Sequence, residues 1–296
     1  MRITQGMMSS NMLNNLTKSY SQIDKYLNQV NTGRKINKPS DDPFIAIKGL
    51  GYGTQLRQIE QYQRNTNEVH NWLDNSDAAL DNGTQALQRI RALTGQAAND
   101  TYSEAERKNI LEEVKQIKED LIDTANRSVN GKYLFNGTDT DNAPITRNDD
   151  GTLSFNMSTT DVKIEVADDI KLTVNVNGNR MFGEELLGEN GTIDKLILAL
   201  ENDDREAISA SLGSIDERID DVINTRAELG ARMNRLTLIE NRLESQKIIA
   251  KDTKAKNELV EYEEAITNLI TQETLHRAAL SASTRVLQPT LMDFLR

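Results

Sequence analysis

The chain has 296 residues, of which 37% are hydrophobic and only 4% aromatic, and its formal net charge is −11. This acidic balance argues against a phosphate-binding surface, so nucleic acid is not an expected partner. The sequence contains no cysteine, which excludes disulfides, zinc–thiolate sites and thiol nucleophiles. No apolar run reaches the roughly 18 residues of a membrane-spanning helix, and no cleavable signal peptide is recognisable at the start, so we expect no membrane insertion.

The first predicted element is an amphipathic helix over residues 7–31. Its apolar residues are separated alternately by three and four positions, which is typical of a coiled-coil seam. They are Leu13, Leu16, Tyr20, Ile23, Leu27 and Val30. Gly33 is suited to a left-handed cap behind this helix, and Asp42 followed by Pro43 predicts the start of the next one.

A long helix is predicted from Phe44 to about Leu93, because apolar residues recur at helical spacing and the chain has only four prolines. The predicted buried face consists of Ile59, Tyr62, Thr66, Val69, Leu73, Ser76, Leu80, Gly83, Leu87 and Ile90. Glycines at 49, 51 and 53 predict a kink or a short break, and Asn82–Gly83 is a second weak point. A further helix is predicted over about Glu104–Val129.

The middle of the chain, from about residue 132 to 185, changes to turn signals and period-two alternation. Two alternating runs, 162–166 and 170–176, predict a β-hairpin closed by Ala167–Asp169. Helix is predicted to return at about Thr192 and to continue as a long helix after Asp204. A polar stretch, Lys251–Asn257, is predicted to separate that helix from a terminal one.

The terminal helix carries a second narrow apolar stripe, which skips Glu273 and His276 and precedes Pro289. Its members are Leu259, Tyr262, Ile266, Leu269, Leu280 and Leu287. Two such ends favour pairing with each other, with neighbouring copies, or with both, so both stripes are predicted to form an assembly interface. The fold class expected is mainly α, an elongated helical coiled-coil rod with a small β-rich insert.

The predicted organisation is palindromic, with a terminal helix and half of a helical rod on each side of the insert. The segments are 1–40 (assembly helix and loop), 41–130 (first half of the rod), 131–190 (β-rich outer domain), 191–250 (returning half) and 251–296 (assembly helix).

No motif predicts catalysis, a cofactor or a metal. The two histidines, His70 and His276, lie far apart and are expected to be solvated or interface residues. An acidic cluster is expected to be a solvated loop, because it lacks the calcium-loop pattern; it consists of Asp139, Asp141, Asp149 and Asp150. The triplets starting at Asn136 and Asn190 are weak glycosylation signals.

Two motifs resemble the flagellin superfamily. Residues 31–43, from Asn31-Thr32-Gly33 to Asp41-Asp42-Pro43, are similar to the loop after the first flagellin helix, and residues 229–236 are similar to the signature of the returning helix. Within the superfamily, residues 131–138 and the ending 291–296 resemble the family that joins the flagellar hook to the filament. The start of the first helix matches flagellin itself poorly.

The resemblance implies a structural subunit of the bacterial flagellum, located outside the cell at the hook–filament junction. It implies export in an unfolded state through the flagellar type III channel, without a cleaved signal peptide. The implied partners are the first hook-associated protein, flagellin, copies of the chain itself in a ring, and a cytoplasmic export chaperone. The alternatives are a short flagellin, a helical signalling rod, which would need a membrane anchor, and an enzyme.

Overall fold

The computed structural model describes residues 5–99, 102–148 and 150–287. The chain divides into two compact units. The terminal unit consists of Met1–Gln58 and Ser245–Arg296, and the central unit consists of Ile59–Glu244. Both predicted terminal helices therefore belong to one unit.

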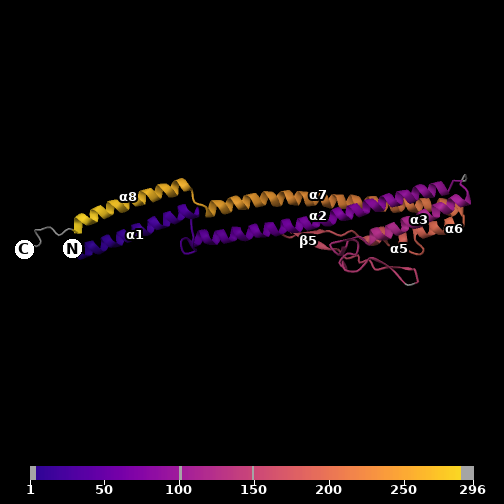
Figure 1. The fold of residues 1–296 in the computed structure, drawn as a ribbon, viewed down its shortest axis with the longest axis horizontal. Coiled ribbons are helices and arrows are strands. Elements are labelled where there is room, and N and C mark those ends of the chain that lie inside the picture. The colour runs from indigo at the N-terminus through magenta and orange to yellow at the C-terminus, as the bar shows by residue number, and fades with distance from the viewer. Residues whose placement is uncertain (1–4, 100–101, 149, 288–296) are drawn as a thin grey trace, which may run out of the picture. The chain divides into compact units, whose positions relative to one another are not determined.

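In the terminal unit, two helices pack side by side: α1 (Gln5–Thr32) and α8 (Tyr262–Leu287) (Figure 1). They run antiparallel, because the end of α1 meets the start of α8: Val260 N donates to Gly33 O at 3.0 Å. Gly33 has a φ of +68°, which confirms the predicted left-handed cap. A Cβ at Gly33 would also lie 2.8 Å from Tyr262 Oη, so the Tyr262 ring would have to shift.

The loop after α1 is hydrogen-bonded to the last turn of α7 (Arg205–Glu258), just before α8 begins. Lys35 N donates to Glu258 O at 2.8 Å, and Lys35 Nζ donates to Lys256 O at 2.7 Å. Asp42 then caps α2 (Pro43–Ala97), since its carboxylate accepts from the backbone N–H of Phe44 at 2.9 Å. The predicted cap at Asp42 is confirmed. The α1–α2 connection and the α7–α8 connection are therefore held together by backbone and side-chain hydrogen bonds.

Helix α7 (Arg205–Glu258) runs through Lys251–Asn257, so the predicted break in that polar stretch is wrong. Lysine and alanine are good helix formers, and the stretch contains neither Gly nor Pro to interrupt the ladder. The break falls later, at Leu259–Glu261. The short break expected as one possibility at residues 49–53 does not occur, and the weak point at Asn82–Gly83 does not interrupt the helix, because α2 is continuous through both.

Gly83 has a packing role in α2 instead. A Cβ at this position would lie 3.4 Å from two atoms of the Phe182 ring. Phe182 itself packs edge-on against Phe135, with ring centroids 5.1 Å apart. The missing side chain thus admits an aromatic pair to the helix surface.

Within the central unit, α2 and α7 run antiparallel and are bridged by polar side chains. Gln63 Nε2 donates to Glu244 at 2.9 Å, and Arg226 donates to Asp77 and Asp81 at 3.1 and 2.8 Å. The predicted seam of α2 is buried except for half-buried Tyr62. Two further helices, α3 (Glu104–Ala125) and α6 (Thr192–Glu201), pack on each other.

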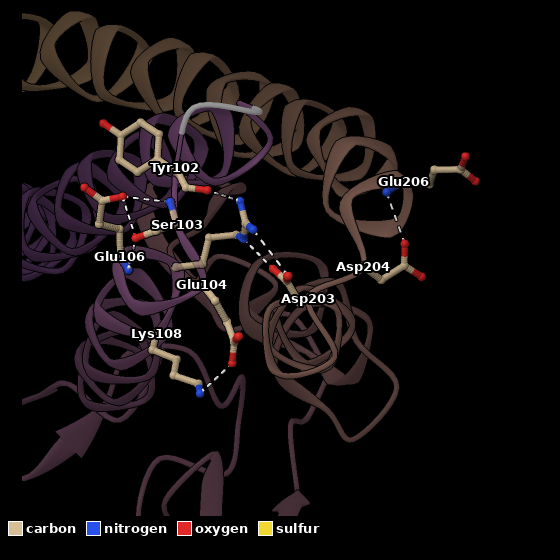
Figure 2. A network of polar contacts seen from close by, with 9 residues as sticks. Tyr102, Ser103, Glu104, Glu106, Lys108, Asp203, Asp204 and Glu206 are labelled. Carbon is tan, nitrogen blue, oxygen red and sulfur yellow. Dashed lines mark hydrogen bonds and ion pairs between the residues drawn. The ribbon is translucent and has the colours of Figure 1, made fainter.

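A polar network holds the start of α3 next to the start of α7 (Figure 2). Ser103 caps α3 in a capping box, with Ser103 N donating to the Glu106 carboxylate at 2.7 Å. This backbone hydrogen bond lowers the pKa of Glu106. The buried Arg107 donates to both carboxylate oxygens of Asp203 and to Tyr102 O, and its hydrogen bond lowers the pKa of Asp203.

The insert consists of three two-stranded antiparallel ladders rather than one sheet. They pair β1 (Ser128–Val129) with β2 (Lys132–Tyr133), β3 (Ile145–Arg147) with β4 (Leu153–Phe155), and β5 (Lys163–Ala167) with β6 (Ile170–Thr173). Asn130 and Gly131 both have positive φ between β1 and β2, as a two-residue hairpin turn requires. The third ladder is the hairpin that the alternation predicted.

Two short helices, α4 (Gly178–Phe182) and α5 (Glu184–Leu187), follow the strands. The predicted fold class is confirmed: the protein is mainly α-helical, and long helices precede and follow a small strand insert. In the part of the chain that the structure describes, no helix is long and apolar enough to cross a membrane.

Candidate assembly surfaces

The two units differ sharply in how much apolar surface they bury. Among the described residues, the central unit contributes 38 of the 40 buried hydrophobic side chains, and the terminal unit contributes only Ala250 and Ala265. Conversely, 16 of the 19 exposed large hydrophobic side chains belong to the terminal unit. Soluble proteins rarely leave such surfaces contiguous unless they bind something, so the terminal unit is the candidate assembly surface.

The predicted stripe of α1 divides into two sets of residues. Within each set, the residues recur every seven positions. Leu16, Ile23 and Val30 are half-buried on the side that faces α8. Leu13, Tyr20 and Leu27 remain exposed, Leu13 by 60% and Tyr20 by 67%. Pairing with α8 therefore covers only one half of the predicted seam, and a second apolar row stays free along the helix.

On α8, the face that packs on α1 is not the predicted stripe. The covered positions are Ala265, Leu269, Gln272, His276, Ala279 and Ser283, again at spacings of three and four. Of the predicted residues, only Leu269 belongs to this face; Leu259, Tyr262, Ile266 and Leu280 are exposed, and the side chain of Leu287 lies outside the described part. Small residues let two helices approach closely, so the seam uses Ala and Ser where the sequence analysis followed larger residues.

His276 lies in this helix pair rather than in solvent. Its ring centroid is 6.1 Å from that of Tyr20, and its Nδ1 atom is buried without a hydrogen-bond partner among the described residues. Ser19 Oγ on α1 is also buried without a partner there. The α1–α8 pair therefore leaves two buried polar atoms without hydrogen bonds among the described residues, and it also leaves several apolar side chains exposed.

Sequence analysis missed a second exposed apolar row at the start of α2. Phe44, Ile47 and Leu50 are 79%, 70% and 72% exposed. They recur every third residue, which was a visible signal, but the predicted buried face of this helix began only at Ile59. Ile248 and Ile249 on α7 are exposed as well.

The other candidate residues lie in ordinary structural surroundings. His70 is an exposed residue of the central unit, with Nε2 3.3 Å from Asp74. Within the described residues, no group of three or more His, Asp or Glu is arranged to hold a metal ion.

The loop candidates are engaged in local hydrogen bonds. Asp139 accepts from Asn142 at 3.0 Å, Asp150 accepts from Thr152, Asp141 is exposed, and Asp149 lies outside the described residues. Asn136 is buried, and both ends of its amide are hydrogen-bonded, so it is inaccessible to a glycan. Asn190 is exposed.

Comparisons with known proteins agree with this architecture. Residues 3–140 match the bacterial flagellin N-terminal helical region, and residues 212–295 match the bacterial flagellin C-terminal helical region. The chain therefore belongs to the flagellin family, as its motifs indicated. The end segment 291–296, which carried part of the resemblance, lies outside the described residues.

Similarity over the whole chain is to a particular branch of this family. The chain is 24% identical to flagellar hook-associated protein 3 of Escherichia coli K12, over 96% of each protein. It is 28% identical to phase 1 flagellin of Salmonella naestved over only 51% of this chain and 30% of that flagellin. The comparisons therefore favour hook-associated protein 3 over flagellin.

Solved structures share the fold. The crystal structure of Bacillus cereus FlgL superposes with a TM-score of 0.60 at 24% identity, covering 69% of this chain and 99% of that one. The flagellar junction protein FlgL of Legionella pneumophila gives 0.58 at 16% identity, covering 72% and 100%. The family is made up of structural flagellar proteins.

Proposed function

We propose that this chain is the structural subunit that joins the flagellar hook to the flagellin filament. The observation that carries the proposal is the match to hook-associated protein 3 along nearly the whole of both proteins, whereas flagellin matches half of the chain. A catalytic role is not part of the proposal, because the family is structural.

The exposed rows of the terminal unit suggest how the subunit polymerises. Leu13, Tyr20 and Leu27 on α1 lie on a helix pair that has almost no buried apolar core of its own. Neighbouring subunits would cover these side chains, at roughly 25 cal/mol for each Å² of apolar surface removed from water. A helix pair that is stabilised mainly by neighbours would become fully ordered only at the growth site.

The proposed partners follow from the position at the junction. They are the first hook-associated protein on the hook side, flagellin on the filament side, and further copies of the chain in a ring. We also propose export in an unfolded state without a cleaved signal peptide, with a cytoplasmic chaperone covering the apolar C-terminal helix. The subunit would then reside outside the cell.

Deleting the gene tests the proposal directly. We expect hooks without filaments, together with flagellin lost to the medium, because filament subunits would have nothing to attach to. Hooks without filaments and without flagellin in the medium would instead identify the chain as the filament subunit. Normal filaments would contradict both functions.

Truncation tests the role of the terminal unit. Removing about 30 residues from either end should abolish incorporation into flagella while the central unit keeps its cooperative unfolding transition. Incorporation of either truncated chain would contradict polymerisation through the terminal helices.

A further inference from the structure

Charge is distributed very unevenly between the two units. The terminal unit contains 15 Lys and Arg against 10 Asp and Glu, and the central unit contains 20 against 36. The formal charges are therefore +5 and −16. Copies of such a chain attract one another when the terminal unit of one meets the central unit of another.

The positive charge of the terminal unit gathers around a groove of about 360 Å³. The groove lies between the loop after α1, the start of α2 and the end of α7. Gly49 and Gly53 line it, so part of its wall is bare backbone, and Leu50 gives it an apolar edge. Its cationic lining residues are Arg34, Lys38, Arg57 and Lys254, and the one acidic residue among its described lining is Glu258.

These four cations lack close carboxylate partners among the described residues, although Lys38 interacts at longer range with Asp41. None of them takes part in an ion pair among the described residues, and Arg57 donates only to the hydroxyl of Thr54. In the central unit, by contrast, cations such as Arg89, Arg107 and Arg226 are paired with carboxylates. The groove therefore combines an apolar residue with cations that form no ion pair. A complementary surface would present carboxylates next to an exposed aliphatic side chain.

The central unit presents such a surface on α7. Ile223 is 49% exposed, and Asp220 lies one helical turn before it. Glu217 lies one turn before Asp220, and neither carboxylate forms an ion pair among the described residues. We call Glu217, Asp220 and Ile223 the acidic stripe.

The other exposed aliphatic residues of the described central unit fit less well. Leu238 lies one turn from Arg235 and from Arg242, which would repel the groove. Leu198 lies one turn from Lys195 and from Glu201, and Glu201 is already bonded to Lys115 at 3.0 Å. Ile223 combines exposure with carboxylates that form no ion pair among the described residues, and Arg226, one turn after it, is already paired with Asp77 and Asp81.

We propose that the basic groove of one copy receives the acidic stripe of a second copy when the chain assembles. This inference rests on the proposed junction function, since it concerns contacts between subunits in the ring. Leu50 contacts Ile223, while the groove cations neutralise Glu217 and Asp220. The contact adds a polar, salt-sensitive interface to the apolar rows of α1 and α8.

The natural absence of cysteine makes a cross-linking test clean. Two differently tagged chains, Leu50→Cys and Ile223→Cys, are expressed together in the deletion strain, and isolated flagella are oxidised. We expect a disulfide-linked dimer containing one chain of each kind. The matched control replaces Ile223→Cys with Leu238→Cys, which should give no mixed dimer. Absence of the Leu50–Ile223 product from assembled flagella would overturn the proposal.

Charge reversal tests the same contact without cysteines. One double variant reverses the groove charges (Arg57→Glu with Lys254→Glu), and the other reverses the stripe charges (Glu217→Lys with Asp220→Lys). Each double variant should reduce the number of attached filaments about tenfold. The chain that carries all four substitutions should restore the filaments. Lys48→Glu and Glu68→Lys, exposed charges outside the groove and the stripe, serve as matched controls without effect. Circular dichroism of each purified chain verifies folding.

The outcomes separate this inference from the proposed function. If deletion leaves filaments normal, the junction function fails. If wild-type complementation restores filaments and the combined charge swap does not, the junction function stands and the pairing between copies is wrong. Cross-linking of Leu50→Cys to a different protein would likewise overturn it, because the groove would then have another occupant.

Discussion

At the residue scale, single polar groups hold the ends of the central helices in place. Arg107 is only 3% exposed, and its guanidinium is satisfied by Asp203 and by the carbonyl of Tyr102 (Figure 2). A buried guanidinium is costly to desolvate, so its bonds must all be made. The residue therefore connects the α2–α3 turn to the α6–α7 turn.

This ion pair predicts a pH dependence of stability. The hydrogen bond from Arg107 lowers the pKa of Asp203 in the folded chain, so the folded state binds this proton less readily than the unfolded state does. The stabilisation is complete above the unfolded pKa and is lost as pH falls through the lower folded pKa. We expect the melting temperature of Asp203→Asn to fall less steeply than wild type below about pH 4.

Melting curves between about pH 2 and pH 6 measure this difference. Asp220→Asn, which removes an exposed carboxylate without an ion pair, is the control and should follow the wild-type curve. Identical slopes for wild type and Asp203→Asn would show that the pair does not stabilise the fold.

At the element scale, α1 carries two apolar rows with different partners. One row faces α8 within the same chain, and the other remains exposed. Seven-residue spacing alone predicted the union of the two rows, because it defines a stripe without saying which partner covers each half. On α8, the covered row contains small and polar residues, which a search for large apolar side chains does not find.

Substituting the two rows separately should separate folding from assembly. Leu13→Gln, Tyr20→Gln and Leu27→Gln together change the exposed row. The stability of the free subunit should change by no more than about 0.5 kcal/mol each at Leu13 and Leu27, and by more at Tyr20, because its ring also contacts His276 on α8. Incorporation into flagella should nevertheless fail, because the contact with neighbours is lost.

The matched triple variant carries Leu16→Gln, Ile23→Gln and Val30→Gln on the covered row. It should lower the helical circular dichroism of the free subunit, because the α1–α8 pair loosens. Normal incorporation of the exposed-row variant, measured in isolated flagella, would refute the assignment of the two rows.

At the scale of the whole molecule, apolar burial and charge are both divided between the units. Nearly all buried hydrophobic side chains belong to the central unit, and the terminal unit carries the positive charge. We therefore expect the central unit to fold stably by itself, and the terminal unit to gain much of its burial from partners.

This division predicts that the terminal unit opens first. Amide hydrogens of α1 and α8 should exchange with deuterium at a much lower opening free energy than those of α3 and the central part of α2. Mass spectrometry of peptides from the free subunit measures this. In assembled flagella the same amides should become protected, and equal protection of both units in the free subunit would contradict the prediction.

Much of the organisation follows from the sequence itself, because it is encoded in local patterns. Helical periodicity predicts α1, α2 and α7, the cap at Asp42 predicts the start of α2, and alternation predicts the β5–β6 hairpin. These features depend on neighbours within a few residues. The motifs at residues 31–43 and 229–236 also indicated the flagellin superfamily, because each is short and continuous in the sequence.

The tertiary structure alone decided which faces are covered. The choice of Ala265 and Ser283 over Ile266 and Leu280 depends on how closely α1 approaches α8, which no single helix encodes. The contact of the Phe182 ring with the α2 surface at Gly83 likewise joins residues far apart in the sequence. The groove and its four cations form only where residues 34–57 meet residues 254–258, two segments that are far apart in the sequence.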